Sequence, residues 1–284
     1  MDLENIRLNK PIKELLRFSI INIDKPTGPT SFAVSQYVRR ALKLTKTSHM
    51  GTLDPQVTGV LPVALDRACR LSSYLMHRDK TYVGIMRLHT KVSQERLKEV
   101  IAEFTGKISQ LPPVRSRVKR EVREREVKSF DILEIEGTDV LFRTKVQAGT
   151  YIRKLVSDMG DKLGGAHMLE LRRTEAGLFT EDKLYKLYDF DKAVEALKAG
   201  DEKPLRNMLV PGEIVASLIS NISIKKDQVA RILRGSPIFK RDLAGKVSLD
   251  REEKVAVFSG DKFIGCYRIV NEGDVVCVPE FVFN

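Results

Sequence analysis

One aspartate in this chain has the setting of a catalytic carboxylate. Asp54 lies between Gly51 and Pro55, which predicts a loop of restricted backbone in which the side chain has no obvious capping role. An ionised, desolvated carboxylate can attack an electrophilic carbon. A Leu-Asp-Pro sequence more often holds an aspartate that stabilises its own turn, so a second residue is needed before the loop points to chemistry.

Arg153 is the candidate partner of that carboxylate. It follows Gly149-Thr150-Tyr151, and the apolar stripe over 152–163 predicts a helix with Arg153 in its first turn. A guanidinium beside a carboxylate favours the ionised form. A surface ion pair is the commoner fate of an arginine, and sequence spacing alone does not bring these two residues together.

The composition limits the class of protein. The 284 residues carry 49 Lys and Arg against 38 Asp and Glu, a net charge of +11, which predicts a polyanionic partner or a solvated basic surface. Three cysteines without metal-ligand spacing predict a reducing compartment and no disulfide framework. With an acidic start and no run of 18 apolar residues, we expect a soluble intracellular protein.

The elements that must position Asp54 and Arg153 alternate irregularly. Helical spacing predicts helices after Thr30 or Ser31, after Ser93, and over 61–75 and 152–163, with a helix-like run at 168–171. Apolar runs predict strands over 18–23, 82–90, 127–135 and 140–146, the last two joined by a hairpin. Because strict βαβ alternation is missing, we expect an α+β fold.

The pattern changes toward the end of the chain. Residues 183–207 are helical and charge-rich, and Gly200 is a plausible helix stop. Beyond Pro211-Gly212, a short helix at 229–233 precedes strands over 255–258, 263–269 and 275–278. We therefore expect two domains: a catalytic domain over 1–213, including an N-terminal extension, and a small β-rich module over 214–284.

Six motifs follow one another along the chain: Lys25-Pro26-Thr27-Gly28-Pro29-Thr30-Ser31, His49-Met50-Gly51-Thr52-Leu53-Asp54-Pro55, Lys80-Thr81-Tyr82, Gly149-Thr150-Tyr151-Ile152-Arg153, Gly164-Gly165-Ala166-His167-Met168 and Leu171-Arg172-Arg173-Thr174. In type and order these motifs resemble those of the TruB family of pseudouridine synthases. The resemblance covers roughly residues 10–180 and continues more weakly over 214–284, which are similar to a PUA domain, an RNA-binding module. Residues 111–120 resemble the dyskerin branch, the catalytic subunit of box H/ACA ribonucleoproteins.

This resemblance implies a fold and an activity. The expected fold is a pseudouridine-synthase domain with a mixed, mainly antiparallel sheet flanked by helices, plus a small β-rich PUA domain. The expected reaction isomerises uridine to pseudouridine in RNA. Because isomerisation keeps every atom of the base, no cofactor and no metal are expected.

The resemblance also implies roles for individual residues. Asp54 corresponds to the catalytic aspartate that attacks the uridine or its ribose, Tyr82 to a tyrosine that packs on the flipped base, and Arg153 to the partner of the aspartate. Without the family, Tyr82 would be an ordinary half-buried strand residue. The substrate-binding residues implied by the motifs are His49, Lys25 and Leu171, the last as an apolar wall of the base pocket.

Two basic clusters are candidate RNA contacts, although charge runs are usually solvated faces. Contacts of this kind would be dominated by phosphates and strongly dependent on salt. The candidates in the catalytic domain are Arg115, Arg117, Lys119 and Arg120, and those in the C-terminal module are Lys225, Lys226, Arg231 and Arg234.

Three functions follow as alternatives. The short stretch over 91–110 suggests a catalytic core that relies on an H/ACA guide RNA and small protein subunits to place rRNA, with tRNA as a further substrate. The absence of a Lys-rich tail implies an archaeal, cytoplasmic version. The first alternative is a guide-independent tRNA pseudouridine-55 synthase, and the second is a non-catalytic RNA-binding scaffold.

Overall fold

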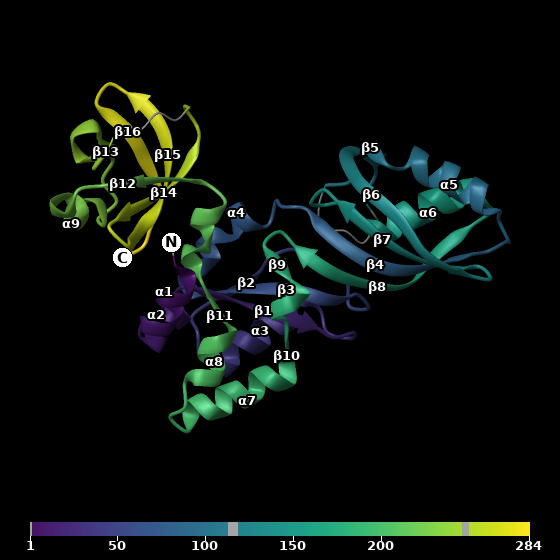
Figure 1. The fold of residues 1–284 in the computed structure, drawn as a ribbon, viewed down its shortest axis with the longest axis horizontal. Coiled ribbons are helices and arrows are strands. Elements are labelled where there is room, and N and C mark those ends of the chain that lie inside the picture. The colour runs from purple at the N-terminus through teal and green to yellow at the C-terminus, as the bar shows by residue number, and fades with distance from the viewer. Residues whose placement is uncertain (1, 113–118, 246–249) are drawn as a thin grey trace. The chain divides into compact units, whose positions relative to one another are not determined.

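The computed structural model describes residues 2–112, 119–245 and 250–284, and the chain forms two compact units (Figure 1). The large unit contains Ile21–Ala64 and Leu75–Met208, and the small unit contains Met1–Ile20, Leu65–Tyr74 and Leu209–Asn284. Asp54 and Arg153 both belong to the large unit. None of the helices built from the described residues has the length and apolar character needed to span a bilayer.

A mixed sheet forms the centre of the large unit. Its strands are β1 (Ser19–Lys25), β2 (Thr47–His49), β3 (Thr58–Leu65), β4 (Lys80–Leu88), β5 (Gly106–Gln110), β6 (Arg123–Glu136), β7 (Asp139–Val146), β8 (Ala166–Ala176), β9 (Phe179–Thr180) and β10 (Tyr185–Lys186). The order is β10-β1-β3-β8-β4-β7-β6-β5, with β2 beside β3 and β9 beside β8. The pairs β1·β10 and β3·β8 are parallel, whereas β4·β8, β4·β7, β6·β7 and β5·β6 are antiparallel. The mixed, mainly antiparallel sheet is confirmed.

Three helices of the large unit begin or end at capping residues that the sequence carries. The helices are α3 (Ser31–Ala41), α5 (Gln94–Glu103), α6 (Ile152–Leu163), α7 (Leu187–Lys198) and α8 (Lys203–Met208), with a 3₁₀ turn η2 (Glu181–Lys183). Thr30 and Ser93 accept hydrogen bonds from the first turns of α3 and α5, and Gly164 ends α6 in the left-handed region. The apolar faces of α5 and α6 pack with β4, β6 and β7 in one core, which fixes the start of α6 relative to the sheet.

Two predictions of secondary structure are wrong. Residues 61–75, predicted as one helix, form the end of β3, then the 3₁₀ turn η1 (Asp66–Leu71) and the short helix α4 (Ser72–Leu75). From Gly59 to Leu65 every residue of β3 is buried, and a run buried on both faces has no period to separate strand from helix. The helix-like run at 168–171 lies inside β8, where pairing with β4 overrides four residues of local pattern.

The small unit has its own five-stranded sheet, in the order β12-β14-β15-β16-β13. Its core combines residues of α9 with the sheet, including Ile232, Ile264 and Tyr267. The three predicted strands correspond to β14–β16. The elements are α1 (Leu3–Asn9), α2 (Ile12–Arg17), β11 (Leu209–Pro211), η3 (Gly212–Ser217), β12 (Ser220–Ser223), η4 (Lys226–Gln228), α9 (Val229–Ile232), β13 (Ile238–Phe239), η5 (Lys240–Asp242), β14 (Lys254–Ser259), β15 (Lys262–Glu272) and β16 (Val275–Val282), together with η1 and α4.

Candidate active site

Asp54 and Arg153 form an ion pair in the large unit. Nη2 of Arg153 lies 2.8 Å from Oδ2 of Asp54, and the two side chains are 56% and 48% exposed, respectively. Exposed pairs of this kind contribute only about 0–1 kcal/mol to stability. The pair therefore orients the carboxylate more than it stabilises the fold.

The residues immediately before this pair anchor it in the core. Leu53 and Ile152 are both buried, and they belong to one apolar cluster that also contains Tyr82 and Leu171. The backbone of Leu53 is held by Ser31, whose hydroxyl accepts from the Leu53 amide at 2.8 Å and donates to its carbonyl at 3.0 Å. The carboxylate of Asp54 and the guanidinium of Arg153 are thus exposed, whereas the residue before each of them, Leu53 or Ile152, is buried in the core.

Lys25 holds the part of the loop that follows Asp54. Its side chain is buried, and Nζ donates to the carbonyl oxygens of Pro26 (2.8 Å), Pro55 (2.9 Å) and Val57 (2.9 Å). Burial lowers the pKa of Lys25, an effect that the charge of Asp54 partly opposes. Three carbonyl acceptors thus surround the ammonium group, and Lys25 holds the backbone at Pro26, Pro55 and Val57. Its substrate contact, expected from the motif, stays a prediction.

The start of α6 is held by a residue that sequence reasoning missed. Tyr151 has no side-chain cap of its own. Instead, Oε1 of Gln110 accepts from the Tyr151 amide at 3.0 Å, and Nε2 of Gln110 donates to the Tyr151 carbonyl at 3.2 Å. Gln110 is buried at the end of β5, and it fixes the turn that carries Arg153. A lone glutamine after a strand gives no local signal of this contact.

Tyr82 and Leu171 lie on neighbouring strands, β4 and β8. Tyr82 is opposite Arg173, and Gly84 is opposite Leu171, in an antiparallel register. Each of the two side chains is 8% exposed. A Cβ on Gly84 would lie 2.9 Å from Cδ1 of Leu171, so the glycine leaves room for that side chain. Tyr82 and Leu171 therefore share one apolar cluster with Leu53 of the Asp54 loop, and their roles in a base pocket stay a prediction.

His49 lies at the end of β2, five residues before Asp54. Its Nε2 is 3.2 Å from Oγ1 of Thr52, so the imidazole contacts the same loop as the carboxylate. Burial, followed by the charge of Arg173, lowers the pKa of His49. The lowered pKa favours the neutral form of the ring.

Two other histidines face each other on β8 and after β4. Nε2 of His89 is 2.9 Å from Nδ1 of His167. Across the described ranges, no group of three or more His, Cys, Asp and Glu side chains gathers as a metal site would.

The predicted RNA-binding residues differ in their availability. Arg115 and Arg117 lie outside the described residues, and Lys119 and Arg120 are exposed at the edge of that gap. In the small unit, Lys225, Lys226 and Arg234 are exposed.

Arg231 is the exception in the small unit. It is half-buried, pairs with the buried carboxylate of Asp242, donates to the carbonyl of Pro237 at 3.0 Å, and lies 5.4 Å from the ring centre of Phe239. Its charge is thus engaged within the fold, whereas Lys226 and Arg234 are exposed. Lys225 is exposed as well, although its Nζ donates to the carbonyl of Arg241 at 2.8 Å.

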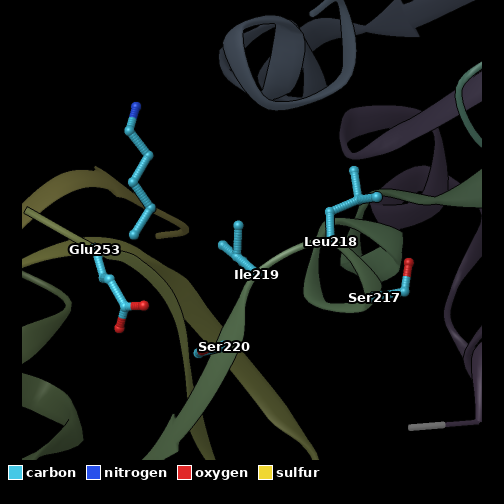
Figure 2. A pocket seen from close by; sticks show the side chains of 6 residues that line it. Ser217, Leu218, Ile219, Ser220 and Glu253 are labelled. Atoms are coloured by element: carbon cyan, nitrogen blue, oxygen red, sulfur yellow. The ribbon is translucent and has the colours of Figure 1, made fainter. Parts of the chain in front are cut away.

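The small unit also carries an open depression (Figure 2). It is lined by residues 217–220, which join η3 to β12, and by Glu253 and Lys254. Lys254 is already paired with Glu280 at 3.2 Å. The lining combines one carboxylate, one ammonium group and small or aliphatic residues, so we assign it no catalytic role.

Comparison with known proteins identifies the family. The model of the N-terminal domain of TruB family pseudouridylate synthases matches residues 39–152, and that of the tRNA pseudouridylate synthase B C-terminal domain matches 153–216. A "Probable tRNA pseudouridine synthase B" of Methanothermobacter thermautotrophicus is 44% identical over 238 residues, 83% of this chain and 74% of that protein. The chain belongs to the TruB family of pseudouridine synthases. A protein of the same name from Archaeoglobus fulgidus is 43% identical over 253 residues, which cover 88% of this chain and 78% of that protein.

Solved structures of the TruB family agree in fold. A Cbf5-Nop10-Gar1 complex contains a chain of TM-score 0.88 and 38% identity, with 98% of this chain and 88% of that chain covered. A chain in an H/ACA ribonucleoprotein bound to a substrate RNA containing 2′-deoxyuridine gives a TM-score of 0.86 at 36% identity, covering 98% and 89%. The pseudouridine-synthase fold is confirmed, and this TruB-family protein is an isomerase that acts on RNA.

Proposed function

We propose that this TruB-family enzyme converts uridine to pseudouridine at sites chosen by an H/ACA guide RNA, with Asp54 as the nucleophile. The ion pair between Asp54 and Arg153, 2.8 Å long and built on the buried supports Leu53 and Ile152, is the observation that carries the catalytic part. The guided part is supported by the similarity, over 98% of this chain, to chains in complexes that are described as Cbf5-Nop10-Gar1 and as an H/ACA ribonucleoprotein.

The chemistry requires a nucleophile and a shaped pocket. The Asp54 carboxylate attacks C1′ of the ribose or C6 of the base, the C1′–N1 bond breaks, and its electron pair leaves with the uracil. The uracil turns and C5 bonds to C1′. The bond that Asp54 formed to C1′ or C6 breaks and returns its electron pair to the carboxylate, and the hydrogen on C5 is lost as a proton while N1 gains one. Tyr82 and Leu171 would hold the flipped base during this turn, because stacking on an aromatic ring returns part of the unstacking free energy.

We assign binding of the guide to the small β-rich module. Residues 214–284 resemble a PUA domain, and Lys225, Lys226 and Arg234 offer exposed cations to phosphates. Residues 1–213 would supply catalysis, and small protein subunits like Nop10 and Gar1 would complete a cytoplasmic particle. Contacts of this kind depend on shape and on salt.

A guide-independent tRNA pseudouridine-55 synthase is the second candidate. The specific observation in its favour is that curated relatives at 43% and 44% identity carry the name tRNA pseudouridine synthase B. A non-catalytic RNA scaffold is disfavoured, because a scaffold has no use for an aspartate, an arginine and a tyrosine brought to one place.

Release of tritium from RNA labelled at C5 of uridine tests the proposal. Wild type and Asp54→Asn would be compared on a bare tRNA transcript and on a target strand paired with an H/ACA guide, with the partner subunits present. A guide with a scrambled pairing sequence is the control. Release that depends on Asp54 and on the matched guide supports the proposal. Release at full rate on bare tRNA without a guide would establish the second candidate in its place.

A further inference from the structure

Arg173 is a buried charge without a carboxylate partner. It lies on β8, only 1% exposed, and in the part of the chain that the structure describes no carboxylate oxygen is within 4.0 Å of its guanidinium. Burying an unpaired ion is costly unless hydrogen bonds and a function compensate. Its neighbour Arg172 differs, since it pairs with Asp24 and Glu181 while remaining partly exposed.

The guanidinium of Arg173 joins the Asp54 loop to the sheet. Nε donates to the carbonyl of Val60 on β3 at 2.8 Å, and Nη2 donates to the carbonyl of Gly51 at 3.0 Å. Gly51 has φ +92°, and a Cβ there would lie 3.3 Å from Nη1 of Arg173. The glycine therefore serves both the left-handed turn and the close approach of the cation, three residues before Asp54.

The same side chain reaches the other half of the site. Arg173 is the register partner of Tyr82, and its interaction with the Tyr82 hydroxyl partly offsets the lowering of the Arg173 pKa by burial. The charge of Arg173 also contributes to the lowered pKa of His49. A second buried cation, Lys80, donates to the carbonyls of Met76 and Arg78 beside it.

We propose that Arg173 is the positioning residue of this active site, which holds the Gly51–Asp54 loop and Tyr82 in one arrangement and keeps a fixed positive charge behind them. The proposal rests on the proposed nucleophilic role of Asp54. When the C1′–N1 bond breaks, negative charge develops on the uracil. A preorganised charge in a poorly solvated interior stabilises such charge more effectively than water does. Because Arg173 is buried, it acts through the loop and its field without touching RNA.

Two variants separate geometry from charge. Arg173→Met removes both hydrogen bonds and the charge but keeps an apolar stem, whereas Arg173→Lys keeps the charge and cannot span both carbonyls. Arg172→Met is the matched control. In single-turnover assays with saturating guided RNA, we expect Arg173→Met to lower the rate about 10²-fold, as misplacement of a reacting group by about 1 Å does, and Arg173→Lys to lose less. The Kd for RNA should change less than about threefold for both, which is under about 1 kcal/mol of binding free energy.

A pH readout distinguishes positioning from simple support of the fold. Titration of the His49 ring by NMR should give a higher pKa in Arg173→Met, because a cation that lowers it is gone, and an unchanged pKa in Arg173→Lys and Arg172→Met. If Arg173→Met does not fold, the rate of Arg173→Lys relative to wild type carries the test, because that variant keeps the charge but cannot donate to both carbonyls.

The Asp54→Asn variant in the same assays keeps the two proposals apart. Activity retained by Asp54→Asn would contradict the role of Asp54 itself. Loss of activity in Asp54→Asn, with full single-turnover rates in folded Arg173→Met and Arg173→Lys, would overturn the role of Arg173 alone. An unchanged pKa of His49 in Arg173→Met would show that the charge of Arg173 has no electrostatic effect on the site.

Discussion

Arg153 donates to Asp54 across 2.8 Å, from the first turn of α6 to the loop that follows β2. Neither side chain is buried, yet Leu53 and Ile152, the residues just before them, are both core residues. The pair is therefore oriented by the core and remains open to a nucleotide.

The first prediction concerns Arg153. Replacement by Met should lower the single-turnover rate strongly and leave the free energy of unfolding within about 1 kcal/mol of wild type, because exposed ion pairs stabilise little. Single-turnover assays and urea unfolding measure the two quantities. Arg153→Lys, which keeps the charge, is the matched variant and should retain more activity. A large loss of stability with an unchanged rate would show that the pair serves the fold.

The second prediction concerns Lys25. Lys25→Met leaves the carbonyls of Pro26, Pro55 and Val57 without their donor, so we expect a loss of about 2–5 kcal/mol in the free energy of unfolding. Urea unfolding gives the value, and Lys91→Met at an exposed site is the control, expected within about 0.5 kcal/mol of wild type. Equal free energies of unfolding for the two variants would show that the hydrogen bonds of Lys25 do not stabilise the loop.

The third prediction is a pH dependence from Lys80. Burial, followed by the charge of Arg173, lowers the pKa of Lys80 from 10.5 to about 8. Between these values the unfolded chain binds more protons than the folded one, so the stability contribution of Lys80 rises with pH across this window, and its penalty is fully present below it. The unfolding free energy of wild type should therefore rise relative to that of Lys80→Met as the pH increases through this window. A constant difference between the two would contradict the lowered pKa.

The fourth prediction concerns Gln110. Gln110→Leu leaves the Tyr151 amide without its acceptor and loosens the turn that carries Arg153, so we expect a rate loss of about 10–100-fold from misplacement. Gln110→Glu keeps that acceptor and should lose less. Single-turnover rates at saturating RNA compare the two, and equal rates for Gln110→Leu and wild type would dismiss Gln110 as a positioning residue.

The fifth prediction separates RNA contact from structural support in the small unit. Lys226→Ala and Arg234→Ala should each reduce the slope of log K against log salt by about 0.7–0.9, if each contacts one phosphate. Arg231→Ala should leave that slope unchanged and lower stability by about 1–3 kcal/mol, since Asp242 loses its partner. Binding titrations at several salt concentrations and urea unfolding provide the test. A changed slope for Arg231→Ala alone would reverse these assignments.

Much of the site could be predicted from sequence because its motifs are local. The loop of Asp54, the helix start at Arg153 and the strand of Tyr82 all lie where the pattern places them. The contact between Asp54 and Arg153 could not follow from spacing, since it depends on how α6 packs against the sheet.

The residues that hold the site in place, Arg173 and Gln110, could not be predicted from the sequence. Arg173 reaches Gly51 only because β3 and β8 pair, and Gln110 reaches Tyr151 only because β5 ends beside α6. Strand register and long-range side-chain contacts leave no local period. The same reason explains the error at β3, whose uninterrupted burial gives no alternation to read.

The most direct test of the account is tritium release by Asp54→Asn, measured beside wild type on the same C5-labelled RNA with binding to that RNA monitored in parallel. The account predicts that the variant binds RNA as wild type does and releases no tritium above background. Release at the wild-type rate by a folded, RNA-bound Asp54→Asn protein would contradict it.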